Sequence, residues 1–286
     1  MSFILKAVSL MLLMKLEFSV AQSDVCTPGA SGSKIVKDTV SKVESTLGGT
    51  NMLLERTAFV ESKNGEDLNT YRDGYHGGIW QVDRIGFEDT QNVASHRKLK
   101  EHFKKLYTDF GIDWSTVKYE DLRKPLYSAI AARLKYLNVP SPIPPSWQLT
   151  RQAEYWKKNY NTRSGKGSVS KFKTDIFQID QSFKHDCNRG KKKFSQSCAQ
   201  CHTISSGGQH KTGPNLSGVC GRQAGQSSGY SYTNAMKDSG ITWNEETLNR
   251  FLLNPKRMIP GIKMVFAGIK NTKVRRGLIN YLCNCP

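Results

Sequence analysis

Three absences limit what this chain of 286 residues can be. After the start of the chain, no segment reaches the roughly 18 consecutive apolar residues that a membrane span needs, and the mean hydropathy is −0.52, which excludes a polytopic membrane protein. No internal repeat of about 20–50 residues is present, which excludes a solenoid or a propeller. Acidic residues are scarce, with 24 Asp and Glu against 42 Lys and Arg, so the formal charge is +18.

The hydrophobic start of the chain predicts a secretory signal. Lys6 precedes an apolar run over residues 7–14, and Ala21 stands at a cleavage position, so we predict a signal peptide over residues 1–21. The remaining length is enough for two modest domains, each with its own core. We therefore expect a secreted mature protein with no transmembrane segment.

Hydrophobic periodicity favours helices over strands, so we predict an all-α protein. The predicted helices of the first half occupy residues 35–47, 52–60, 96–110, 122–137 and 150–160, and Asp121 is the expected N-cap of the fourth. A stretch rich in Ser, Gly and Lys follows, and after Cys187 the composition changes to more Gly and Cys. We predict a first domain over residues 33–162, a linker over 163–186 and a second domain over 187–286.

The second domain contains a CxxCH sequence from Cys198 to His202. Thiols at this spacing, Cys198 and Cys201, lie on one turn and can add to the two vinyl groups of one haem, after which the adjacent His faces the iron. A zinc or redox CxxC followed by His is the alternative for the motif alone. Met264 stands 62 residues after His202 and offers a thioether for the sixth iron position, which favours the ferrous state.

Further residues of the second domain suit the same site. The carbonyl of Pro214 can accept the second imidazole N–H of His202 and fix its tautomer. Candidates to hold the haem propionates follow along the chain: Arg222, Tyr232, Thr233 and Trp243. Between Cys187 and Cys283, the strings GQHKTGPNL, GYSYT, NPKRMIPGIKM and VFAGIK resemble mitochondrial cytochrome c. The resemblance implies an all-α fold around one covalently bound haem c and one-electron transfer without a substrate reaction.

The charge of the second domain supports an electron carrier. Residues 187–286 hold 15 Lys and Arg against three acidic residues, a net +12. The resemblance places five basic residues at or near the exposed haem edge: Lys211, Lys256, Arg257, Lys263 and Lys270. Such a ring implies docking to an acidic redox protein that weakens with salt, and a merely solvated basic face is the alternative. Nucleic acid is disfavoured as a partner, because no base-reading motif accompanies the charge.

Three positions depart from the family pattern. Phe251 stands where the family has Tyr, Ile262 where it has Thr, and Met236 where it has Asn. Each family residue supplies a polar contact or a water site near the Met ligand. The replacements predict a drier pocket, which disfavours the cationic ferric haem and raises the potential.

The first domain carries a different motif. Glu61 and Ser62 end a predicted helix, and the segment from Gly77 to Asp83 follows after a polar loop. This resembles the ES…GxxQ arrangement of lytic transglycosylases and goose-type lysozymes, over about residues 36–160. The resemblance implies a lysozyme-like α-helical domain that cleaves bacterial peptidoglycan, whose anionic wall would attract a basic chain.

A chemical role for Glu61 is coherent with its surroundings. A carboxyl beside the apolar residues 58–60 has a raised pKa and can protonate a glycosidic oxygen. Asp73 and Asp83 are candidates for a second carboxylate that positions water, which a lytic transglycosylase does not need. The candidate sugar contacts are Tyr75, Gly77, Gly78, Trp80 and Gln81. The alternatives are an inactive carbohydrate-binding module, a surface role for Glu61 and core packing for Trp80.

Five cysteines remain beside the CxxCH pair, and an odd number leaves at least one free or paired between chains. Cys187 and Cys283 lie on helices that cross in the cytochrome family, so we expect a bridge from Cys187 to Cys283 or to Cys285. Disulfides fit the secretory route. The family's haem is installed in the mitochondrial intermembrane space, which is the alternative compartment. A vestigial haem domain and an artificial joining of two neighbouring genes are further readings of the same sequence.

Overall fold

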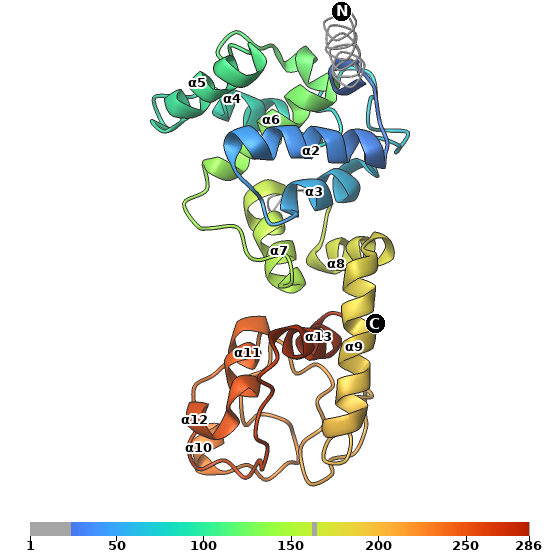
Figure 1. The fold of residues 1–286 in the computed structure, drawn as a ribbon, viewed down its shortest axis with the longest axis vertical. Helices are drawn as coiled ribbons and strands as arrows, with labels where there is room; N and C mark the ends of the chain where they lie inside the picture. The colour runs from blue at the N-terminus through green and yellow to red at the C-terminus, as the bar shows by residue number, and fades with distance from the viewer. Residues whose placement is uncertain (1–23, 162–164, 286) are drawn as a thin grey trace, which may run out of the picture. The chain divides into compact units, whose positions relative to one another are not determined.

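The computed structural model describes residues 24–161 and 165–285 (Figure 1). Helices joined by loops make up this part of the chain, with one isolated antiparallel bridge between Gln223 and Thr242 and no strand. The predicted all-α class is therefore confirmed for these residues. No helix among them is long and apolar enough to cross a membrane. The predicted signal peptide, residues 1–21, lies outside the described residues.

The chain divides into two compact units, which we describe separately. The first unit comprises residues 24–143 and 158–161, and the second comprises residues 144–157 and 165–285. The helices of the first unit are α2 (Ser33–Leu47), α3 (Leu53–Ser62), α4 (Arg84–Asp89), α5 (Leu99–Phe110), the 3-10 helix η1 (Tyr119–Arg123) and α6 (Pro125–Leu137). Those of the second are α7 (Leu149–Trp156), α8 (Val169–Ile179), α9 (Gln181–Ser197), α10 (Asn234–Lys237), α11 (Glu245–Leu253), α12 (Pro255–Met258) and α13 (Thr272–Cys283). A π-helix, η2 (Lys157–Asn161), follows α7 directly.

Helix α6 forms the centre of the first unit. Leu126, Ile130 and Leu134 lie on one face of α6 at i, i+4 spacing, are buried, and α2 packs against this helix. Pro125 occupies the first turn of α6, where a residue without an N–H costs no hydrogen bond. The helix therefore starts later than we expected, and Asp121, our predicted N-cap, lies in η1 instead.

Helices α9 and α13 cross in the second unit (Figure 1). A Cβ atom on Gly190 of α9 would collide with the backbone of Gly277 in α13, so only a glycine allows this approach. Phe194 packs against Tyr281 beside the crossing, with ring centroids 5.6 Å apart. Two disulfides, Cys187–Cys285 and Cys220–Cys283, fix the end of α13, and Cys26 is free. Of the two partners that we expected for Cys187, the structure has Cys285.

The segment that we predicted as a linker, residues 163–186, contains α8 and the first residues of α9. Ser168 caps α8 by accepting a hydrogen bond from the Lys171 N–H at 3.1 Å. Phe172 and Ile176, four residues apart, are both fully buried, and the Phe172 ring packs on Trp156 with centroids 5.2 Å apart. The apolar face is what makes this otherwise polar segment helical.

Candidate functional site

A cavity of about 350 Å³ lies in the second unit, among α9, α11, α13 and the loops between them. Its walls are mostly apolar, with Phe194 from α9, Leu248 and Leu252 from α11, and Leu278 from α13. The volume falls in the range of about 300–1000 Å³ that is usual for sites of organic ligands. These helices therefore enclose a space that their own side chains do not fill.

The CxxC thiols line this cavity at the end of α9. Cys198 ends the helix, and the N–H groups of Cys201 and His202 both donate to its carbonyl, at 3.0 and 2.9 Å. Both thiols are free and partly exposed. Burial raises the pKa of the Cys198 thiol to about 11. The tight turn thus presents two thiols to one cavity, as the spacing predicted.

His202 is held with one ring nitrogen available to the cavity. Its Nδ1 lies 2.7 Å from the Pro214 carbonyl oxygen, and because a carbonyl only accepts, Nδ1 carries the proton and Nε2 keeps its lone pair. Gly213 lies against the imidazole, so a Cβ there would collide with the ring. Burial lowers the pKa of His202, and the bond to Pro214 opposes that effect. The result is an oriented, neutral imidazole.

Met264 lines the same cavity, on the loop that follows α12. Lys263 anchors this loop by donating from Nζ to the Ser231 carbonyl at 3.0 Å. Phe251, Ile262 and Met236, the three positions that depart from the family pattern, also line the cavity. These three apolar side chains are therefore part of the same cavity lining, and the dryness of the pocket stays a prediction.

The predicted propionate-binding residues, Arg222, Tyr232, Thr233 and Trp243, all line the cavity as well. Their side chains also have structural partners. Arg222 donates to the carbonyls of Ser217 and Asn215, at 3.1 and 3.0 Å, and Thr233 caps α10. Burial raises the pKa of Tyr232, so its hydroxyl stays protonated and can donate. The predicted residues thus belong to a larger polar part of the lining, which also includes Thr212 and Tyr230.

The lining as a whole fits a flat, mostly apolar ring with a metal at its centre. Two free thiols, an imidazole nitrogen with a lone pair and a thioether all line one cavity, with apolar side chains between them. Imidazole and thioether are ligands that iron in a porphyrin takes on its two faces.

Comparison with known proteins agrees with this geometry. A family model described as cytochrome c matches residues 187–265. The cytochrome c of Ginkgo biloba is 50% identical over 97 residues, which cover 34% of this chain and 86% of the relative. This chain belongs to the cytochrome c family. The cytochrome c proteins of Cannabis sativa (48% identity, 36% of this chain and 94% of the relative) and Chlamydomonas reinhardtii (52%, 34% and 87%) are similar over comparable spans.

Membership applies to the second unit, which we call the cytochrome unit from here on. It identifies covalently bound haem c as the cofactor and electron transfer with redox proteins as the activity of this part. The matched family region begins at Cys187, so the first unit and helices α7 and α8 lie outside it.

The five predicted docking residues of the cytochrome unit, Lys211, Lys256, Arg257, Lys263 and Lys270, are all exposed. Three of them donate from Nζ to backbone carbonyls: Lys211 to Ala199 at 2.6 Å, Lys263 to Ser231 at 3.0 Å and Lys270 to Leu253 at 3.5 Å. Val265 is 88% exposed and follows Met264 directly. Basic side chains and one bare apolar side chain therefore share the surface at the cavity.

In the first unit, the structure changes the roles of the predicted sugar contacts. Trp80 is fully buried and donates from Nε1 to the Leu54 carbonyl at 2.8 Å, so it cannot stack on a sugar. A Cβ on Gly78 would collide with the Leu122 carbonyl and with Ser128, and Gly77 is likewise buried and crowded. Gln81 donates to the carbonyls of Thr70 and Gly78, at 3.0 and 2.7 Å. These four residues shape a packed loop, which corrects the predicted stacking role of Trp80, while sugar contacts by Gly77, Gly78 and Gln81 stay a prediction.

The predicted carboxylates lie in different settings. Glu61 stands at the end of α3 and is partly exposed. Asp83 caps α4, with Oδ1 accepting from the Gly86 N–H at 2.7 Å, and Asp73 is an exposed loop residue. The charges of Glu61 and Asp83 both act on Tyr75, whose pKa is raised mainly by burial. Glu61 and Asp83 are thus both close enough to Tyr75 to act on its hydroxyl electrostatically.

Two residues beside these carboxylates were missed by sequence reasoning. Lys135 donates to the Tyr160 carbonyl at 3.1 Å, and its Nζ lies 4.5 Å from the Tyr160 ring centroid. Burial lowers the pKa of Lys135, while Asp83 and Glu61 oppose this shift. The sequence held no clear signal for it, since Lys135 is only partly buried and follows Arg133, the buried cation of α6.

Proposed function

We propose that the cytochrome unit carries haem c on thioether bonds from Cys198 and Cys201, with His202 Nε2 and the Met264 sulfur as iron ligands. The observation that supports this most is the shared cavity lining together with the His202–Pro214 bond, which leaves Nε2 as an acceptor. The haem supplies a site that gains and loses one electron.

The residues around the site prepare it for this step. The bond to Pro214 fixes the imidazole plane and increases the basicity of its Nε2. The thioether of Met264 favours the ferrous state. The apolar lining by Phe251, Ile262 and Met236 excludes water and acts in the same direction. We therefore propose a potential on the high side for this family.

The exposed basic residues suit an acidic redox protein as partner. Docking through Lys211, Lys256, Arg257, Lys263 and Lys270 would be steered by charge and would weaken with salt. Val265, exposed beside Met264 and next to Lys263 at the cavity, would add an apolar contact to such docking. The relatives are cytochromes c of the mitochondrial type, which fits the mitochondrial intermembrane space, the alternative compartment, for this unit.

Two measurements test the haem site. The intact mass of the native chain should exceed the sequence mass by one haem, and a Cys198→Ala, Cys201→Ala variant should lose this increment. In the ferric protein, the weak near-infrared charge-transfer band of Met–iron ligation should be present and should disappear in Met264→Ala. A wild-type protein with covalent haem but without this band would contradict the role of Met264.

For the first unit, we propose cleavage of peptidoglycan with Glu61 as proton donor. The supporting observation is the group around Glu61, whose charge acts on Tyr75, Lys135 and Tyr160. Asp83 is the second carboxylate of that group, and its capping bond to Gly86 makes it a positioning residue. Glu61→Gln should abolish the clearing of a bacterial cell-wall suspension, while Asp73→Asn should leave it unchanged. If the wild type binds the wall without clearing it, the unit is a carbohydrate-binding module instead.

A further inference from the structure

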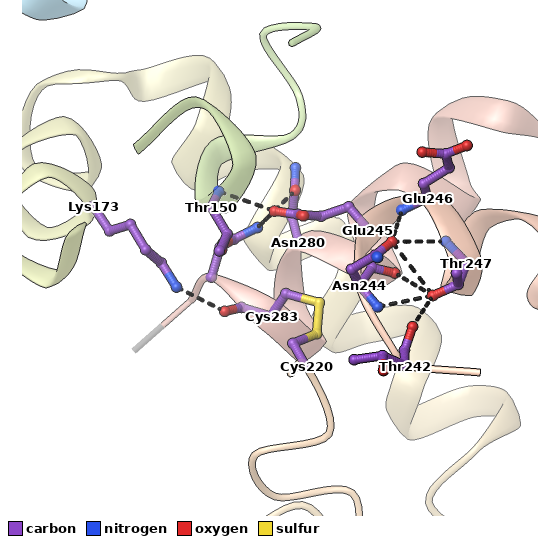
Figure 2. Close-up of a disulfide and its surroundings, with 11 residues drawn as sticks. Thr150, Lys173, Cys220, Thr242, Asn244, Glu245, Glu246, Thr247, Asn280 and Cys283 are labelled. Carbon is purple, nitrogen blue, oxygen red and sulfur yellow. Dashed lines mark hydrogen bonds between the residues drawn. A yellow bond between two sulfur atoms is a disulfide. The ribbon is translucent and has the colours of Figure 1, made fainter. Parts of the chain in front are cut away.

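The end of the chain carries two disulfides at neighbouring positions. Cys285 bonds to Cys187 in α9, and Cys283, the last residue of α13, bonds to Cys220 (Figure 2). Both pairs therefore start from the same short segment and lead to different parts of the cytochrome unit. The chain thus contains a natural pair of bonds for comparison.

Cys220 lies next to the cavity wall. Its neighbours Val219 and Arg222 line the cavity, and the Gly221 N–H donates to the Trp243 carbonyl at 2.7 Å. In return, the Trp243 N–H donates to the Arg222 carbonyl at 2.9 Å. The backbone segment that begins at Cys220 therefore holds Arg222 and Trp243 in the wall.

Cys283, the other half of this disulfide, lies at the end of α13. Leu278 and Leu282 of the same helix, α13, line the cavity. The Cys283 carbonyl accepts a hydrogen bond from Lys173 Nζ at 3.0 Å (Figure 2). The Cys220–Cys283 bond thus joins two parts of the cavity wall, α13 and the segment before Trp243.

The other disulfide differs in position and in access. None of the four cysteines lines the cavity itself, but Cys187 is only 5% exposed. Cys220, Cys283 and Cys285 are partly exposed, so Cys220–Cys283 offers two accessible sulfur atoms and Cys187–Cys285 offers one. Because thiol–disulfide exchange requires that a thiolate reach a sulfur atom, a reductant in solution should open Cys220–Cys283 first.

We propose that Cys220–Cys283 is a second redox-active site, which exchanges with an external dithiol and controls how firmly the wall closes on the haem. One thiolate of the dithiol attacks a sulfur of the bond, and a mixed disulfide forms as the Cys220–Cys283 bond breaks. The second thiol of the reductant then displaces the protein sulfur. The dithiol is oxidised to its disulfide, and two electrons and two protons end on the thiols of Cys220 and Cys283.

Opening the bond should loosen the wall without unfolding it. The end of α13 stays fixed by Cys187–Cys285 and by the Asn284 N–H, which donates to the Asn280 carbonyl at 2.8 Å. The segment at Cys220 retains only its backbone hydrogen bonds and the contacts of Arg222. This asymmetry makes the Arg222–Trp243 side of the cavity the part that opens to water and to small ligands.

The experiment uses the full-length holoprotein and rests on the haem site proposed above. Free thiols are first blocked with N-ethylmaleimide, the protein is treated with graded dithiothreitol, and new thiols are alkylated and mapped by mass. After removal of the reductant and reoxidation with ferricyanide, imidazole is titrated into the ferric protein. We expect Cys220 and Cys283 to be labelled before Cys187 and Cys285. Imidazole affinity should rise on the order of tenfold, within the usual range for coupling between two sites.

Matched variants separate this coupling from a general loss of stability. Cys220→Ser with Cys283→Ser should reproduce the higher imidazole affinity and a lower midpoint potential, whereas Cys187→Ser with Cys285→Ser should change neither. Equal effects of the two double variants, or an unchanged affinity after selective reduction, would overturn the proposal. Earlier labelling of Cys187 and Cys285 would do so as well. If Cys220→Ser with Cys283→Ser fails to retain haem, the proposal is tested by the labelling order and the imidazole affinity of the wild type after graded reduction. A wild type without covalent haem would reject the haem site, whereas the labelling order does not depend on it.

Discussion

Two loop regions of this protein combine glycines with aromatic and polar side chains. One surrounds Trp80 in the first unit and the other surrounds His202 in the cytochrome unit, and they differ in whether these side chains pack or line a cavity. In the first unit, Trp80, Gln81 and Gly78 satisfy one another and their neighbours, and Trp80 is fully buried. In the cytochrome unit, His202 and Met264 line a cavity of about 350 Å³. The space around Trp80 is filled by contacts among neighbouring side chains, whereas the side chains around His202 leave a cavity large enough for a cofactor.

The largest expected effect concerns that space. With Cys198→Ala and Cys201→Ala, the protein without attached haem should keep an unfilled cavity, at a cost of about 8 kcal/mol for 350 Å³. This is comparable to the whole stability of a domain, about 5–15 kcal/mol. Hydrogen exchange followed by mass spectrometry should show lost protection in the cytochrome unit and unchanged protection in the first. Cys26→Ala is the control. Equal protection of both units in the variant would contradict the prediction that only the cytochrome unit depends on haem to fill its cavity.

The second effect concerns the self-packed loop of the first unit. Gly78 has φ +62°, and a Cβ there would collide with the Leu122 carbonyl, so Gly78→Ala should destabilise this unit by about 3 kcal/mol or more. Gly74 has φ +70° with nothing within 4 Å of the Cβ position, so Gly74→Ala should cost only about 1–2 kcal/mol. Urea unfolding followed by tryptophan fluorescence measures both. Similar losses would mean that the loop is less tightly packed than described.

A smaller expected effect tests whether the apolar lining of the cavity raises the midpoint potential. Phe251 is 6% exposed and packs on Trp243, with centroids 4.9 Å apart. Phe251→Tyr adds a hydroxyl to the cavity and should lower the midpoint potential by about 30 mV, equivalent to roughly 0.7 kcal/mol for one electron. Phe251→Leu, which adds no polar atom, is the control. A rise in the potential of the Tyr variant in voltammetry would contradict the role of dryness.

The smallest effect concerns Lys135, whose pKa is lowered mainly by burial. The folded first unit therefore releases this proton at lower pH than the unfolded chain does. Its free energy of unfolding should rise as the pH increases through the folded pKa toward the unfolded value of 10.5. Lys135→Met should lose this rise, and Lys104→Met, at an exposed position, should retain it. Urea unfolding at several alkaline pH values measures the slope, and an unchanged slope would argue against a desolvated ammonium.

Local sequence patterns predicted those features that depend on residues close together in the chain. The periodic apolar residues of α2 and α6 were predicted because the backbone period acts within a few residues. The start of α6 was misplaced, because Pro125 sets it and Asp121 only resembles a cap. Helix α8 was missed, because its polar composition hides the pair Phe172 and Ile176, whose burial depends on Trp156.

The sequence by itself determined the cofactor class, covalently bound haem c, because the CxxCH motif carries its meaning in residue type and spacing, and it predicted Pro214 and Met264 as partners of the site. Only the tertiary structure decided which motif residues face a cavity and which are buried. It also decided that Cys187 pairs with Cys285, and Cys220 with Cys283. The physical reason is that burial, disulfide pairing and the placing of Lys135 beside Asp83 depend on contacts between segments far apart in the chain.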